Sequence, residues 1–260
     1  MIDCLKNAIV YDVELYRNMF MCGMYSIATG KYRHYIIHPD SGRDDREALI
    51  SMFGGLALNE DESEKSIEDK RILIGYNNRK YDDPVLFHLY NNPKIEVGKL
   101  WEWSQKLIDE KNSLLAYKEK SFNLRSIDLS EFSRIGPLPK KLKLIGCSLK
   151  HQKLQDLPID YLSEVTTEQV EELAKYNIND LEITYKILLH EMPRLEMREI
   201  LGKQYNLDLL SCSDTSIAKQ FFQKRYLAKC GSSDFIKLRT YRRDLPFADL
   251  IYDYIIFKTP

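Results

Sequence analysis

Four acidic residues occupy positions from which their side chains could meet in a folded chain. Asp12 and Glu14 alternate across one residue at the end of an apolar, β-prone run, so both side chains would leave the same face of a strand. Asp82 follows a second apolar run, and Asp180 lies in a long amphipathic segment. Carboxylates gathered on one face repel each other unless a cation neutralises them. Hard oxygen ligands suit Mg²⁺ or Mn²⁺, so we expect these acids to bind two divalent metal ions.

A tyrosine accompanies the last of these acids. Tyr176 precedes Asp180 by four residues, which places the two side chains about one turn apart on one face of a helix. Apolar residues at helical spacing predict such a helix from about Thr167 to His190. A phenol has a pKa of ~10, so it is better suited to orienting a water molecule than to removing its proton.

The acids can meet only if the fold brings distant stretches together. Apolar runs bounded by turn signals predict strands over residues 7–11, 18–27, 32–38, 71–76 and 124–129. Helical spacing predicts helices over residues 44–58, 85–90, 100–115, 167–190 and 215–228. Elements in this order indicate an α/β protein with a mixed β-sheet flanked by helices and a C-terminal helical extension.

Composition narrows the class of protein. The 260 residues are 44% hydrophobic and 30% charged, which is typical of a globular protein with a sizeable core. The formal net charge is −1, so nucleic-acid binding would depend on local patches such as the basic stretch over residues 137–153. The five cysteines are scattered and favour a reducing compartment over a disulfide framework or a structural zinc. Without a signal-peptide core or a membrane-length apolar run, the sequence predicts a cytoplasmic protein.

Three short motifs, taken together, resemble those of a known enzyme family. They are Tyr11-Asp12-Val13-Glu14, residues 75–82 (Gly-Tyr-Asn-Asn-Arg-Lys-Tyr-Asp) and residues 176–180 (Tyr-Asn-Ile-Asn-Asp). Their order is similar to the exonuclease motifs of the DEDD superfamily of 3′–5′ exonucleases, and the tyrosine before the last acid is similar to its tyrosine subclass. The second motif and the lysine-rich stretch before the third resemble the proofreading domains of phage family B and protein-primed DNA polymerases.

This resemblance covers roughly residues 5–192 and implies a fold, a reaction and the residues that perform it. The fold would be RNase H-like, and the reaction would be two-metal hydrolysis of single-stranded DNA ends to nucleoside 5′-monophosphates. Asp12, Glu14, Asp82 and Asp180 would hold the metal ions. Tyr176 would position the attacking water.

In the second motif, two residue assignments each have an alternative: the asparagine that contacts the substrate and the aspartate that binds the metal. Asn78 matches the asparagine with which the family contacts the terminal nucleotide, and adjacent Asn77 is the alternative. Asp83 competes with Asp82 as the metal ligand. We favour Asp82 because it directly follows the aromatic Tyr81.

Basic and aromatic residues would contact the DNA. Lys143 resembles a lysine that the protein-primed branch places near the scissile phosphate, with Lys141 and Lys150 as alternatives. Lysines between residues 140 and 153 could also contact the DNA backbone. The aromatic candidates for stacking on bases are Phe20, Tyr76 and Tyr81, and for Tyr76 we favour packing in the core.

The sequence also predicts how the chain is divided into domains. We expect an exonuclease domain over residues 1–194 and a helical extension over residues 195–260, which could be the start of a truncated polymerase domain. The apolar, strand-like run over residues 250–260 favours a following domain, because an exposed apolar edge invites aggregation. The alternatives are a free-standing DNA or RNA exonuclease and a catalytically idle module that only binds nucleic acid. A metal-binding measurement would separate the idle module from the nucleases.

Overall fold

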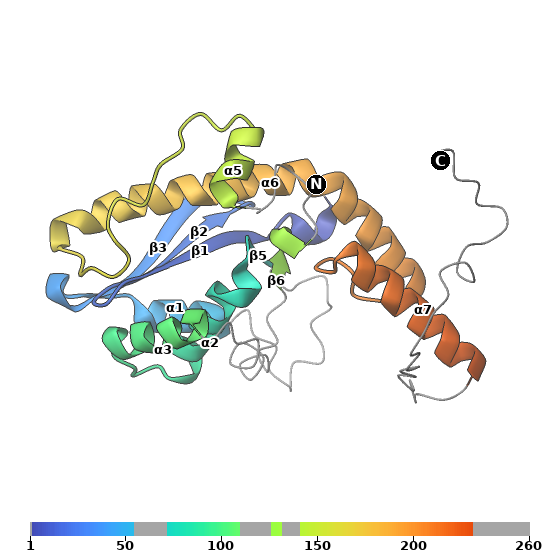
Figure 1. Cartoon of the computed structure of the whole chain (residues 1–260), viewed down its shortest axis with the longest axis horizontal. Helices are drawn as coiled ribbons and strands as arrows, with labels where there is room; N and C mark the ends of the chain where they lie inside the picture. Colours follow the sequence, from blue (N-terminus) through green and yellow to red (C-terminus); the bar gives the residue numbers. More distant parts are fainter. Residues whose placement is uncertain (1, 55–71, 110–125, 132–140, 231–260) are drawn as a thin grey trace, which may run out of the picture. The chain divides into compact units, whose positions relative to one another are not determined.

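The strands form one mixed sheet. The computed structural model describes residues 2–54, 72–109, 126–131 and 141–230, and in this part of the chain the strand order is β4-β3-β2-β1-β5-β6 (Figure 1). The strands are β1 (Ile9–Leu15), β2 (Phe20–Ser26), β3 (Lys31–His38), β4 (Arg43–Asp44), β5 (Leu73–Gly75) and β6 (Ser126–Asp128). Strands β1 to β4 pair antiparallel, whereas β5 pairs parallel to both β1 and β6.

Helices cover both faces of this sheet. The helices of the described residues are α1 (Arg46–Gly54), α2 (Asp82–Asn91), α3 (Val97–Asp109), α5 (Leu142–Ser148), α6 (Val170–Tyr205) and α7 (Asp214–Cys230). Figure 1 shows α1, α2 and α3 on one side of the sheet and α6 along the other, with α5 beside α6. The predicted mixed α/β sheet flanked by helices is therefore confirmed, and the arrangement is consistent with an RNase H-like fold.

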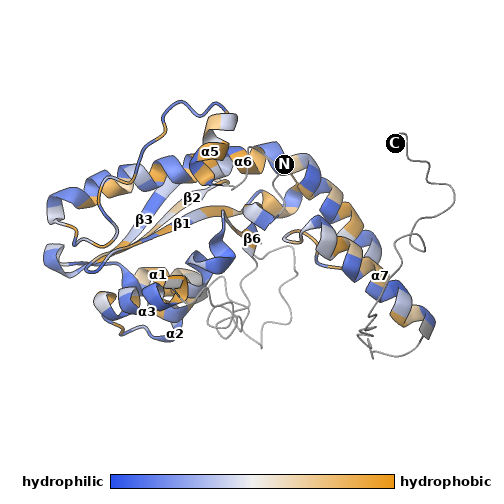
Figure 2. Cartoon of the chain, in the orientation of Figure 1, coloured by the Kyte–Doolittle hydropathy of each residue, from blue (hydrophilic) through white to orange (hydrophobic). Residues whose placement is uncertain are grey.

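Alternation along β1 produces two apolar layers. Ile9, Tyr11 and Val13 pack toward α2 and α3, whereas Val10 packs with residues of α6. Burying one such aliphatic side chain contributes about 1.5–3 kcal/mol, so the two layers stabilise the sheet from both sides. Figure 2 shows hydrophobic residues interspersed with hydrophilic ones along α6, as expected of a helix with one buried face.

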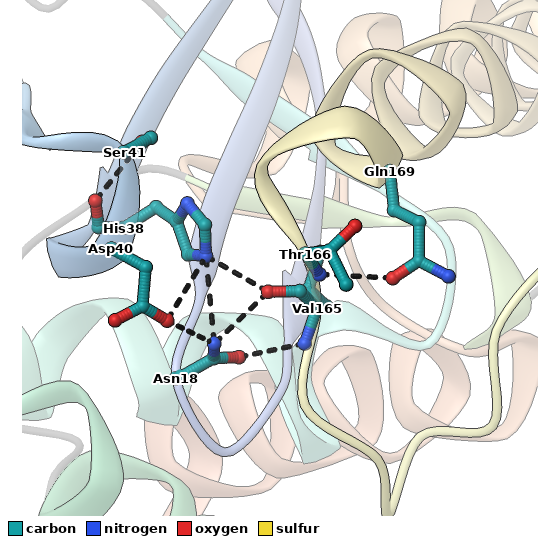
Figure 3. A network of polar contacts seen from close by, with 7 residues as sticks. All are labelled: Asn18, His38, Asp40, Ser41, Val165, Thr166 and Gln169. Atoms are coloured by element: carbon teal, nitrogen blue, oxygen red, sulfur yellow. Dashed lines mark hydrogen bonds and ion pairs between the residues drawn. The ribbon is translucent and has the colours of Figure 1, made fainter.

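The loop that leads into α6 is tied to the sheet by hydrogen bonds (Figure 3). The backbone amide of Val165 donates to Asn18 Oδ1 at 2.8 Å, and its carbonyl accepts from Asn18 Nδ2 at 3.0 Å. His38 Nε2 lies 3.0 Å from the same carbonyl, so this nitrogen carries the proton. A capping box of Thr166 and Gln169 follows directly and leads through a short 3₁₀ turn into the helix. These contacts fix the position at which α6 begins and therefore where it crosses the sheet.

Helix α6 is longer than the sequence predicted. We expected it to end near His190, but it continues through Pro193 to Tyr205. Pro193 cannot donate to the carbonyl of Leu189. Both residues lie on the exposed face of the helix, where water can satisfy that carbonyl, while Leu188 and Leu195 keep the opposite face packed.

Residues 1–219 form one compact unit, and residues 220–260 group as a second. Residue 194, the predicted end of the exonuclease domain, lies inside α6. The predicted strand-like run over residues 250–260 lies outside the described residues. Among the residues that the structure describes, no helix has both the length and the apolar character needed to cross a membrane.

Candidate metal centre

Three carboxylates from two distant elements meet on the α6 side of the sheet. Asp12 and Glu14 come from β1 and Asp180 comes from α6, and one oxygen of each lies within 4.8 Å of the other two. Alternation along the strand explains why Asp12 and Glu14 share a face. Asp180 is buried, whereas Asp12 and Glu14 keep some contact with solvent. The structure thus brings together three of the four acids that the sequence singled out.

Asp82, the fourth acid, borders this group from the start of α2. Strand β5 pairs with β1 only at Ile9 and Val10, so the later part of β1 extends past it. There the backbone amide of Val13 donates to Asp82 Oδ1 at 3.0 Å. The oxygens of Asp82 are not among those within 4.8 Å of one another, but its charge is near enough to raise the pKa values of Asp12 and Glu14.

The neighbouring Asp83 has a different environment. Its carboxylate accepts hydrogen bonds from the Tyr11 hydroxyl, from Asn78 Nδ2 at 3.1 Å and from Ser126 Oγ at 2.8 Å. These donors occupy both of its oxygens and hold the first turn of α2 against β1 and β6. The geometry therefore supports Asp82, and not Asp83, as the acid at the centre.

Burial and mutual repulsion disfavour the charged form of the clustered acids. Burial raises the pKa of Asp12 well above its usual value, and the charge of Glu14 raises it further. Burial, followed by the charges of Asp180 and Asp82, raises the pKa of Glu14 to about 8. Burial and the adjacent Asp83 raise the pKa of Asp82 to about 8 as well. A positive charge placed among these acids would reverse the effect.

The same residues fit a divalent cation. Asp180 Oδ1 is buried and has no hydrogen-bond partner among the described residues. A buried carboxylate oxygen without a partner is costly, and a metal ion is one of the few groups that can satisfy it. Carboxylate oxygens held this close together are the ligands that Mg²⁺ and Mn²⁺ prefer.

Tyr176 and Lys143 meet at the edge of the acid group. Lys143 Nζ, from α5, donates to the Tyr176 hydroxyl at 2.8 Å and lies 4.6 Å from the centre of its ring. Burial and the charge of Asp180 raise the pKa of Tyr176 far above its usual value, so the phenol stays protonated. Burial raises the pKa values of Asp180 and Glu14, and the charge of Lys143 opposes this shift.

The other two candidate lysines lie elsewhere. Lys141 is exposed just before α5, and Lys150 is exposed just after it in a left-handed conformation with φ of 52°. Of the three candidates, only Lys143 contacts a residue of the centre in the part of the chain that the structure describes.

The structure places the two candidates for the substrate contact, Asn78 and Asn77, in different environments. Asn78 is fully buried, and its amide nitrogen is held by Asp83 and by Ser126 Oγ at 3.3 Å. Asn77 is exposed and adopts a left-handed conformation with φ of 61°. This turn, fixed by a 2.8 Å hydrogen bond from the Asn77 backbone amide to Asp128 Oδ1, directs the next side chain inward.

The aromatic candidates for base stacking belong largely to the core. Phe20 is fully buried between the sheet and α1 to α3, so it cannot stack on a base. Tyr81 packs partly buried against the same layer, and burial raises its pKa to about 12. Tyr76 packs against the α6 layer, as we expected.

Two amides between Tyr176 and Asp180, those of Asn177 and Asn179, were missed as candidates in the sequence. Asn177 Nδ2 donates to Asp12 Oδ2 at 2.9 Å, and Asn179 Oδ1 lies 2.9 Å from His151 Nε2. Asparagine is a poor helix former. Two asparagines in one predicted helix, next to a candidate acid, were therefore a signal in the sequence by which these positions could have been found.

Comparison of the chain with protein-family models, with curated proteins and with solved structures finds no match. Function is therefore inferred from the geometry of the centre and from the motifs that supply its residues.

Proposed function

We propose that the protein is a metal-dependent 3′–5′ exonuclease that hydrolyses single-stranded DNA ends to nucleoside 5′-monophosphates. The observation that carries this proposal is the meeting of Asp12, Glu14 and Asp180 within 4.8 Å, with Asp82 beside them. A structural role does not explain such a group, because acids gathered in a partly buried site destabilise the fold unless cations are bound.

Each acid has a place in this proposal. Asp12, Glu14 and Asp180, with Asp82 next to them, would hold two divalent ions, Mg²⁺ or Mn²⁺. When bound, such ions supply the Lewis acidity on which phosphodiester hydrolysis by this class of enzyme depends. The solvent contact of Asp12 and Glu14 leaves the centre open to a DNA end.

Tyr176 and Lys143 act on the reacting groups without a histidine base. The raised pKa of Tyr176 keeps its hydroxyl protonated, so it orients a water by hydrogen bonding and does not remove the proton. Lys143 Nζ, 2.8 Å from that hydroxyl, places a positive charge where charge develops on the phosphate. The exposed Lys141 and Lys150 at the two ends of α5 add positive charge for the DNA backbone.

The order of the three motifs supports a more specific role. It is similar to that of proofreading domains of phage-type DNA polymerases, so we place the protein in DNA replication in the cytoplasm of a host. A polymerase domain in the same full-length chain is the partner that this role implies.

The test is degradation of 3′-labelled and 5′-labelled single-stranded DNA in Mg²⁺, in Mn²⁺ and in EDTA. We expect loss of the 3′ label first, only with metal, and a fall of ~10²-fold or more in the Asp12→Asn/Asp180→Asn double variant. A matched control is Glu171→Gln/Glu172→Gln, which removes two exposed acids of α6. Full activity in the first double variant would refute the assignment. Preferential removal of RNA ends would change the substrate, and absence of Mn²⁺ binding would favour an idle binding module.

A further inference from the structure

We infer that Asn177 is a positioning residue that holds Asp12 in the orientation required for metal binding, and that Gly23 makes this contact possible. The inference rests on the proposed metal centre and adds to it two residues outside the acid group. Asn177 lies on α6, and Gly23 lies opposite Asp12 on the neighbouring strand β2.

The contact between Asn177 and Asp12 has a defined direction. Asn177 is fully buried, and its Nδ2 donates to Asp12 Oδ2 at 2.9 Å. An amide turned the other way would set its oxygen against a carboxylate oxygen, which is repulsive. A hydrogen bond to a carboxylate restricts rotation of that group, so Asn177 selects one orientation of Asp12.

Gly23 is the position that lets the amide reach the sheet. A Cβ atom at Gly23 would lie 1.6 Å from Asn177 Oδ1 and 2.7 Å from its Cγ, so any larger residue would displace the amide. Glycine in the middle of a strand lowers stability by roughly 0.5–1 kcal/mol relative to alanine. Close approach of Asn177 gives a physical reason for a glycine at this point.

The far side of the amide is enclosed by β3. His34 faces Gly23 across the strand pair, and burial lowers its pKa while the Asn177 amide opposes that shift. The two side chains are close enough to interact but do not reach regular hydrogen-bond geometry, and Asn177 Oδ1 has no hydrogen-bond partner among the described residues. A buried amide with an unpaired oxygen costs stability. For folding alone an apolar residue would therefore serve better at this position.

Loss of this contact should weaken metal binding and leave folding intact. Groups that orient metal ligands typically change metal affinity by 10–100-fold. Asn177→Ala removes the amide from a helix in which alanine is favourable, so the fold should persist. Gly23→Ala keeps Asn177 but displaces its amide. If Gly23 acts only through that amide, the double variant should bind metal no more weakly than Asn177→Ala.

The experiment measures Mn²⁺ dissociation constants by electron paramagnetic resonance on the full chain, together with melting in EDTA. We expect both single variants to bind Mn²⁺ about 10-fold or more weakly than wild type. The control is Gly98→Ala in α3, where an added methyl would meet only the Arg17 carbonyl oxygen at 3.5 Å. A folded Asn177→Ala protein with a dissociation constant within about twofold of wild type would overturn the inference. Absence of Mn²⁺ binding by wild type would instead overturn the proposed metal centre.

Discussion

Without metal, the protein should lose stability as the pH rises, because the acids of the centre are costly to ionise. Asp82 is the clearest case, since it is 7% exposed and its pKa rises from 3.8 to about 8. Between these values the folded state keeps a proton that the unfolded state has lost. The free energy of unfolding therefore falls by ~1.4 kcal/mol per pH unit for each acid that behaves this way.

This slope sets the size of the expected effect. From pH 5.5 to 7.5, Asp82 alone should lower the free energy of unfolding by ~3 kcal/mol, which corresponds to about 6–12 °C in melting temperature. Ionisation of Glu14 also lowers the free energy of unfolding as the pH rises, and the contact of Glu14 with solvent reduces the size of this contribution. His34 has the opposite effect, because burial lowers its pKa. As the pH rises and the imidazole loses its charge, His34 therefore raises the free energy of unfolding.

A comparison with Asp82→Asn isolates the contribution of that acid. Asparagine keeps an oxygen to accept the Val13 amide hydrogen but carries no charge. In EDTA, the stability of wild type relative to the variant should fall between pH 5.5 and 7.5, as measured by thermal unfolding. Mn²⁺ should restore wild type at pH 7.5 more than it restores the variant. Equal pH slopes in the two proteins would show that Asp82 does not hold a proton in the folded state.

Two further substitutions separate structural residues from catalytic ones. Asp83→Ala leaves three donors without their acceptor, and two of them belong to the buried residues Tyr11 and Asn78. Urea unfolding should therefore show a loss of ~3 kcal/mol or more at neutral pH, whereas a loss below ~1 kcal/mol would contradict the structural role of Asp83. Tyr176→Phe removes the hydroxyl that contacts Lys143 and Asp180, and it should lower kcat with little change in KM for DNA. An unchanged kcat would mean that Tyr176 only packs in the core.

The local spacing of residues was enough to predict most helices and strands and to predict which of these side chains share a face. Asp12 and Glu14 share a face because strand side chains alternate, and Tyr176 and Asp180 lie near each other because they are one helical turn apart. Each relation involves neighbours within a few residues. The mixed sheet followed from the order of apolar runs, which is also local information.

The sequence failed where backbone conformation or distant packing decides. The left-handed turn at Asn77 sends Asn78 into the core, and no periodic pattern reports such a turn. The sequence predicted a helix end near His190, but α6 continues through Pro193, which lies on the exposed face of the helix. The contact of Asn177 with Gly23 joins residues far apart in the chain, so it becomes visible only in the folded structure.

The location of the centre follows from how β1 is paired. On one side β1 pairs along its length with antiparallel β2, and on the other it pairs with parallel β5 only at Ile9 and Val10. The later part of β1 therefore has an open edge, where the start of α2 can approach and Asp82 can accept the Val13 amide hydrogen. Helix α6 crosses the same stretch and adds Asp180. A longer β5 would close this edge to Asp82, so the short parallel pairing is a condition for placing Asp82 beside the other three acids.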